Sequence, residues 1–76
     1  MIQETYRITE RATDGFVHDL GEHATKERVT DIIAMRANPH AVSVFYQRFD
    51  TDAQRYTYQR WVGTGAQWLN GKTDVS

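Results

Sequence analysis

The chain has 76 residues, with no cysteine and with nine basic against ten acidic side chains, so its formal net charge is −1. Without cysteine it has no disulfide framework and no thiolate ligand for a metal, which excludes a cross-linked secreted miniprotein. The near-neutral charge disfavours a protein whose affinity comes from neutralising many phosphates, because that mechanism requires an excess of lysine and arginine. The length predicts one compact domain over residues 1–70, followed by a flexible polar tail at residues 71–76.

No segment of the sequence has the pattern of a signal peptide or of a membrane span. Glu4 lies near the start of the chain, and no long apolar run follows it. The longest uninterrupted apolar stretch, residues 32–35, is far shorter than the roughly 20 residues that a membrane-spanning helix requires. We therefore expect a cytoplasmic protein without a membrane partner.

The first segment alternates between two sets of side chains, as a half-buried β-strand does. From residue 2 to residue 9, one set of alternate positions is mostly apolar and the other is polar. Asp14 and Gly15 form a pair that is favoured where a tight turn needs a positive φ angle, and residues 16–20 can return antiparallel. The sequence thus predicts a β-hairpin over residues 2–20.

The hydrophobic period changes to that of a helix over residues 26–37. The i, i+3, i+4, i+7 spacing of one helix face is followed by Val29, Ile32, Ile33 and Arg36. Thr25 is a suitable N-cap, because its hydroxyl can accept a hydrogen bond from a free amide of the first turn. Asn38 precedes Pro39, and a residue before proline is disfavoured in the α region, so we expect the helix to end near Ala37.

Residues 41–49 and 55–63 are rich in β-branched and aromatic side chains and flank a polar turn, which is typical of a second β-hairpin. Residues 66–70, after a bend at Gly63-Thr64-Gly65, are predicted to form a last short strand or extension. The expected fold class is α+β. It has an antiparallel sheet of four to five strands, in the order β-hairpin, helix, β-hairpin, with the helix packed on one face.

Aromatic side chains occur on both faces of the second hairpin. If Asp50 pairs with Arg55 across the turn, strict alternation sorts the side chains into two sets. We expect one set to join the core, namely Val42, Val44 and Trp61 together with Tyr6, Ile8, Leu20, Val29, Ile32 and Ile33. We expect the other set to be exposed as the candidate binding site, namely Phe45, Gln47, Phe49, Tyr56, Tyr58 and Arg60. A register shift of one residue would exchange the faces, and Trp68 is a candidate cover for the exposed set.

The segment that comes closest to a catalytic or metal site contains His18, Asp19, Glu22 and His23. Its spacing is one residue longer than the H-x-x-E-H arrangement of helical zinc sites, and Gly21 interrupts any helix that would align the ligands. Ser43 and Ser76 lack the sequence context of a catalytic nucleophile. Since a chain of this size also has little room for a substrate pocket, we expect a non-enzymatic protein with no metal and no cofactor.

The exposed aromatic and arginine side chains indicate a contact surface, because tyrosine, tryptophan and arginine dominate binding hot spots. We expect a protein-binding module that contacts a host protein or a second copy of itself. In size and order of elements the chain resembles the small accessory proteins of bacteriophages and mobile elements, many of which block a host protein. That resemblance implies a role as an inhibitor.

Two alternatives use the same surface. The first is binding of single-stranded nucleic acid, in which Phe45, Tyr56 and Tyr58 would stack on bases. The phosphates would then be met by Arg48, Arg55 and Arg60. Against this alternative, residues 41–63 carry three arginines and two aspartates, a surplus of one positive charge, and they lack the RNP signature of RNA-binding sheets. The second alternative is homodimerisation as the only role of the surface.

Overall fold

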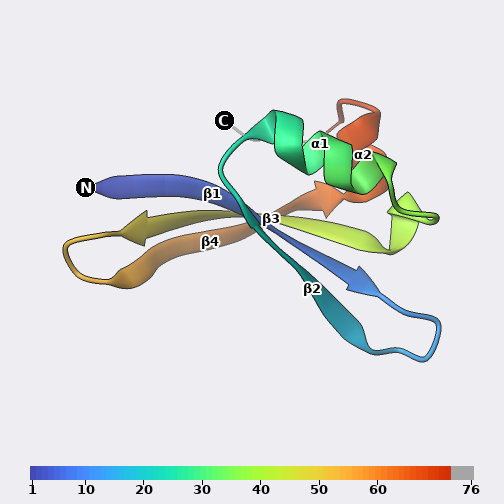
Figure 1. Cartoon of the computed structure of the whole chain (residues 1–76), viewed down its shortest axis with the longest axis horizontal. Helices are drawn as coiled ribbons and strands as arrows, with labels where there is room; N and C mark the ends of the chain where they lie inside the picture. Colours follow the sequence, from blue (N-terminus) through green and yellow to red (C-terminus); the bar gives the residue numbers. More distant parts are fainter. Residues whose placement is uncertain (73–76) are drawn as a thin grey trace.

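Within residues 1–72, which are the residues that the computed structural model describes, four antiparallel strands form one open sheet (Figure 1). The strands are β1 (Ile2–Arg11), β2 (Val17–His23), β3 (Val42–Asp50) and β4 (Arg55–Thr64). The helical segments are α1 (Lys26–Ala34), the 3₁₀ turn η1 (Pro39–Ala41) and α2 (Gly65–Leu69). The strand order is β2-β1-β3-β4, so β1 and β3 are central and β2 and β4 are the edges. Positions 73–76 of the predicted tail, residues 71–76, lie outside the described residues.

The first predicted hairpin is confirmed, and both of its strands run further than expected. β1 continues to Arg11, and its alternation buries Tyr6 and Ile8. β2 continues past the predicted end at residue 20, because Gly21, at a φ of 98°, turns the chain within a bulge opposite β1. The Asp19 carboxylate accepts a hydrogen bond of 2.8 Å from the Gly21 amide and so holds this bend.

Helix α1 begins where the sequence predicts and ends earlier. The Thr25 hydroxyl accepts a hydrogen bond of 3.2 Å from the Arg28 amide, as expected of an N-cap. The prediction that the helix reaches Ala37 is wrong, because the amides of residues 35 and 36 bond to carbonyls three residues back. The chain then turns at Asn38, whose side chain caps η1. Among residues 1–72, no helix has the length and apolar character needed to cross a membrane.

The second predicted hairpin is confirmed as β3 and β4, whereas the predicted extended segment at residues 66–70 is wrong. Residues 65–69 form helix α2. The Thr64 hydroxyl accepts a hydrogen bond of 3.1 Å from the Gln67 amide, and the Gln67 side chain accepts one of 2.9 Å from the Thr64 amide. This reciprocal capping box fixes the start of a helix of only five residues.

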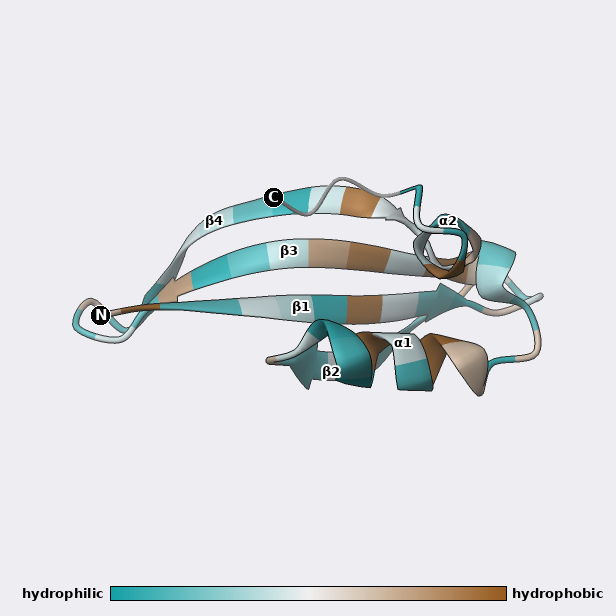
Figure 2. Cartoon of the chain, turned by 90° about the horizontal axis from the view of Figure 1, so that it is seen from above, coloured by the Kyte–Doolittle hydropathy of each residue, from teal (hydrophilic) through white to brown (hydrophobic). Residues whose placement is uncertain are grey.

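The buried apolar side chains form one cluster that joins the central strands to both helices. Its members in the described part of the chain are Tyr6, Ile8, Val29, Ile33, Val42, Val44, Tyr46 and Trp68. Figure 2 shows the corresponding apolar bands on β1, β3 and the two helices. We call the face of the sheet that carries Tyr6, Ile8, Val44 and Tyr46 the core face.

The predicted core is confirmed except at Trp61. Leu20 and Ile32 pack against the cluster as partly buried residues, while Trp61 is 54% exposed. Trp68 is buried instead, and its Nε1 donates a hydrogen bond of 2.9 Å to the Thr30 hydroxyl. The expectation that Trp68 covers the aromatic face is therefore wrong, because this ring packs in the core cluster.

Candidate functional site

The register of β3 against β4 departs from strict alternation after the first two pairs. Asp50 faces Arg55 and Phe49 faces Tyr56, as predicted. A bulge then leaves Thr57 of β4 without a partner residue on β3. The next pair is formed by Arg48 and Tyr58. The extra residue reverses the alternation of β4 relative to β3, so the side chains of residues 58–61 point to the faces opposite to those predicted.

The six predicted site residues are consequently divided between the two faces of the sheet. We call the side that carries Arg7 and Phe45 the opposite face. It holds four of the predicted residues, namely Phe45, Gln47, Phe49 and Tyr56. The placement of Tyr58 and Arg60 with them is wrong, because the bulge turns both side chains to the core face. Trp61 pairs with Phe45 on the opposite face, where the prediction had put Arg60.

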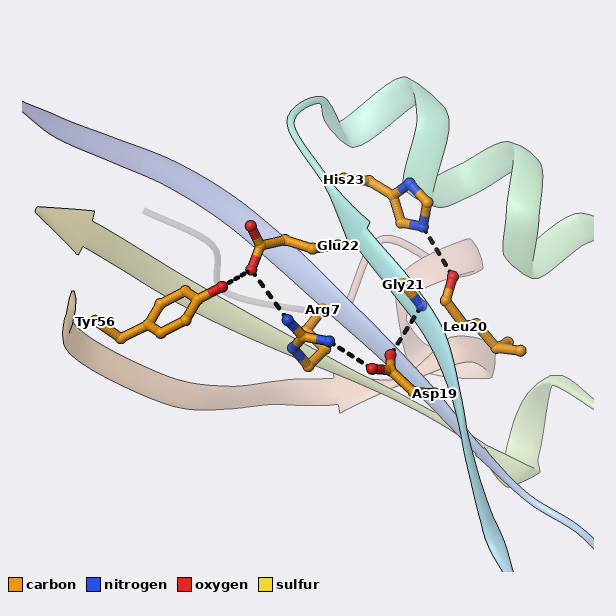
Figure 3. Close-up of polar contacts among 7 residues, drawn as sticks. All are labelled: Arg7, Asp19, Leu20, Gly21, Glu22, His23 and Tyr56. Carbon is orange, nitrogen blue, oxygen red and sulfur yellow. Dashed lines mark hydrogen bonds and ion pairs between the residues drawn. The ribbon is translucent and has the colours of Figure 1, made fainter. Parts of the chain in front are cut away.

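One half of the opposite face is closed by side chains from the two edge strands (Figure 3). The Tyr56 hydroxyl, on β4, donates a hydrogen bond to the Glu22 carboxylate, on β2. Glu22 also accepts a hydrogen bond of 3.2 Å from Arg7, which donates a second one of 2.6 Å to Asp19. Neighbouring strands lie about 4.8 Å apart, so edge side chains meet across two central strands only if the sheet curves strongly.

The polar groups beneath this bridge are packed rather than accessible. Gln47 is 4% exposed, and neither its Oε1 nor the Oγ1 of Thr5, its partner in register, has a hydrogen-bond partner among the described residues. The ring of Phe49 packs edge-on against Tyr56, with centroids 5.0 Å apart. Burial by itself lowers the pKa of Arg7, but the Tyr56 hydroxyl and the two carboxylates outweigh it and raise that pKa. Arg7 therefore remains a cation within the bridge.

The other half of the opposite face is hollowed into a cavity of about 510 Å³. It lies between the end of β1, the starts of β2 and β3 and the loop that contains η1. Its polar lining includes Thr9, Arg11, His40 and Ser43, and its apolar lining includes Val17 and Phe45. Since Phe45 also pairs with the exposed Trp61 in register, the cavity and the tryptophan belong to one continuous surface.

The two residues that the bulge moves to the core face join a cluster of tyrosines and arginines there. The Arg48 guanidinium lies 5.1 Å from the ring centroid of Tyr58 and 5.6 Å from that of Tyr46. Its Nε donates a hydrogen bond of 3.0 Å to the Tyr46 hydroxyl, which donates one of 2.5 Å to Glu4. The hydrogen bond with Tyr46 is the main cause that raises the pKa of Arg48. Tyr58 and Arg48 thus contact groups within the chain.

The residues named for nucleic-acid binding do not share a face. Phe45 and Tyr56 lie on the opposite face, whereas Tyr58 shares the core face with the three arginines, Arg48, Arg55 and Arg60. A bound single strand needs stacking rings and phosphate-binding cations along one groove. Because the rings of Phe45 and Tyr56 lie on the face opposite to the three arginines, the structure disfavours the nucleic-acid site that was predicted from the sequence.

His23 and the two acidic residues of β2 take part in contacts within the chain. His23 Nε2 lies 3.0 Å from the carbonyl oxygen of Leu20, and both Asp19 and Glu22 pair with Arg7. Over residues 1–72, no group of three or more histidine, aspartate or glutamate side chains is placed to hold a metal ion. These contacts give the segment a structural role in the edge of the sheet.

No protein-family model, curated protein or solved structure matches this chain. Sequence reasoning identified Phe45 and missed Trp61, Arg11 and the loop residue His40, which the fold brings to the same side. These residues could not be grouped without the register of the strands. In the sheet, Arg11 pairs with Val17 of β2 and Thr9 pairs with Ser43 of β3.

Proposed function

We propose that this chain is a non-enzymatic protein-binding module whose contact surface is the open half of the opposite face. In this proposal α1 and α2 cover the core face and leave the opposite face for a partner protein. The observation that carries the proposal is the exposure of Trp61, which is 54% accessible beside Phe45 and the cavity. Tryptophan at the centre of a contact surface is among the side chains whose truncation costs the most binding energy.

Charge supports a protein partner over nucleic acid. The formal net charge is −1, and the arginines of the second hairpin lie on the core face, away from Trp61. Affinity for a single strand would require several cations beside the stacking ring. A host protein that the chain blocks fits the proposal, as does any other protein with a complementary apolar side chain.

The test compares the wild-type chain with Trp61→Ala and with Met35→Ala, a control that truncates another well-exposed apolar residue. Each form is immobilised, partners from a bacterial lysate are identified by mass spectrometry, and affinity is measured with the purified partner by calorimetry. We expect Trp61→Ala to weaken binding by about tenfold or more, and Met35→Ala to leave it unchanged. A partner that binds all three forms equally would overturn the proposed surface.

Two further measurements address the alternatives. Fluorescence titration with a single-stranded oligonucleotide at low salt should give no salt-sensitive binding at micromolar concentration. Sedimentation velocity of the purified chain should show a monomer that Trp61→Ala does not change. Salt-sensitive oligonucleotide binding that requires Trp61 would replace this proposal with the nucleic-acid alternative, and a dimer that requires Trp61 would replace it with self-association.

A further inference from the structure

The two arginines of β1 differ in their partners, because Arg7 pairs with carboxylates and Arg11 has no carboxylate partner within residues 1–72. Arg7 pairs with Asp19 and Glu22, and Arg36 pairs with Glu10 at 2.5 Å. Arg11 is exposed, forms no ion pair in the described chain, and lines the cavity. The cavity is therefore lined by a positive charge that no carboxylate of residues 1–72 neutralises.

The rest of the cavity supplies the remaining features of a site for an acidic group. The hydroxyl-bearing residues Thr9 and Ser43 are direct partners in register, so they lie side by side on its floor. His40 borders it from the loop, and Val17 and Phe45 give it apolar walls. Hydroxyl, imidazole and guanidinium groups can donate to a carboxylate, while the apolar walls suit the carbon atoms that carry it.

The wall that contains His40 is held in place before any ligand binds. The Asn38 side chain accepts a hydrogen bond of 3.2 Å from the His40 amide, and Pro39 fixes the first φ angle of the turn. Behind the turn, Gly65 packs so closely that a Cβ there would lie 2.8 Å from the Pro39 carbonyl oxygen. Because this wall is already ordered in the free chain, less conformational entropy is lost when a ligand binds.

We infer that this cavity binds an acidic side chain of the partner protein, with its carboxylate at Arg11 and an apolar neighbour against Val17 and Phe45. This inference rests on the proposed function and adds the chemistry of the partner, an aspartate or glutamate next to an apolar residue. One guanidinium beside hydroxyl groups matches the single charge of a carboxylate. A phosphate would call for more cations than the single guanidinium of Arg11.

The experiment uses the full chain labelled with ¹⁵N and follows its backbone amides by NMR during titration. The probe is N-acetyl-Asp-Leu-amide, and its neutral counterpart is N-acetyl-Asn-Leu-amide. Two further titrations use inorganic phosphate and a single-stranded oligonucleotide. The variants are Arg11→Gln and His40→Gln at the cavity, with Arg28→Gln on α1 as a matched control for loss of an exposed arginine.

The aspartyl peptide should shift the amides of Thr9, Ser43 and Phe45, and the asparaginyl peptide should bind about tenfold more weakly. Arg11→Gln should cause a similar loss, His40→Gln a smaller one, and Arg28→Gln none. Unshifted cavity amides, equal binding of the two peptides, or tighter binding of phosphate or oligonucleotide at these amides would overturn the inference. Thermal unfolding of each variant verifies that it is folded.

The peptide titration and the partner assay test the two proposals separately. If the cavity binds the aspartyl peptide while no protein depends on Trp61, the proposed function is overturned and the acidic-group site remains. If a partner depends on Trp61 while the peptide leaves the cavity amides unshifted, the inference is overturned and the proposed function remains.

Discussion

The Tyr56 hydroxyl donates a hydrogen bond to the Glu22 carboxylate, although the two residues belong to the strands that lie farthest apart in the sheet. In a flat sheet these strands would be about 14 Å apart, so the contact reports a strong curvature. The same contact closes one half of the opposite face and leaves the other half as the cavity beside Phe45. The shape of the candidate surface thus depends on the hydrogen bond between Tyr56 of β4 and Glu22 of β2.

Tyr56→Phe removes the hydroxyl of this bridge while keeping the ring against Phe49. We expect the free energy of unfolding in urea to fall by about 1 kcal/mol, because an exposed hydrogen bond to a charged group is lost. Tyr58→Phe is the control, since the Tyr58 hydroxyl makes no hydrogen bond within the described chain. Equal stability of the two variants would show that the bridge contributes nothing.

The two tryptophans should differ sharply in accessibility to a quencher. Trp61 is 54% exposed and Trp68 is 9% exposed, so acrylamide should quench Trp61 emission several times more strongly. The measurement uses Trp68→Phe to isolate Trp61 and Trp61→Phe to isolate Trp68. The emission of Trp68 should also lie at shorter wavelength. Similar quenching of both single-tryptophan variants would contradict the register of β4.

Gly65→Ala should destabilise the fold by about 1–3 kcal/mol, because the added methyl group would overpack the junction of α2, η1 and the core. Its Cβ would lie 2.9 Å from side-chain atoms of both Ile33 and Val42, in addition to the close approach to Pro39. Gly71→Ala is the comparison, since its Cβ would meet no atom of residues 1–72 within 4 Å and the φ of 69° opposes it by about 1 kcal/mol. Urea denaturation of both variants measures the difference. A Gly65→Ala chain as stable as the wild type would refute the tight packing.

The stability of the fold should decrease in alkaline solution through Tyr6. Burial, and then the charges of Tyr46 and Glu4, raise the pKa of Tyr6 above its ordinary value of about 10. The folded chain therefore holds this proton more tightly than the unfolded chain. Its contribution to stability is complete below about pH 10 and is lost as the pH rises through the folded-state pKa. Urea midpoints measured across this range should fall for the wild type and fall less for Tyr6→Phe; parallel curves would exclude Tyr6 as the cause.

The sequence was sufficient for the elements whose signals are local. The alternation around Tyr6 predicted β1, the Thr25 cap predicted the start of α1, and the Asp50–Arg55 pair predicted the turn of the second hairpin. Helix α2 was also readable, because Thr64 and Gln67 have the spacing of a capping box. The prediction instead placed a bend at Gly63-Thr64-Gly65 and a short strand or extension after it.

The division of the aromatic residues between two faces could not be predicted in the same way. Thr57 suits a regular strand as well as a bulge, so nothing local in the sequence marks the point at which the alternation of β4 reverses. The contact between Tyr56 and Glu22 joins residues 34 positions apart on different edges, and it depends on sheet curvature. Arg11 and His40 likewise meet at one cavity only through the order of the strands.

The position of β1 at the centre of the sheet has a kinetic consequence. Its partner β2 follows within one hairpin, but its other partner, β3, begins only after α1, and Ile8 pairs with Val44. Isolated hairpins form within about 1–10 μs. Pairing β1 with β3 also requires closing a long loop, and the entropy of that closure is lost before the contacts between the strands stabilise the pair. We expect the docking of the two hairpins along β1 and β3 to limit the folding rate, so that substitutions at Ile8 or Val44 slow folding more than substitutions in either turn.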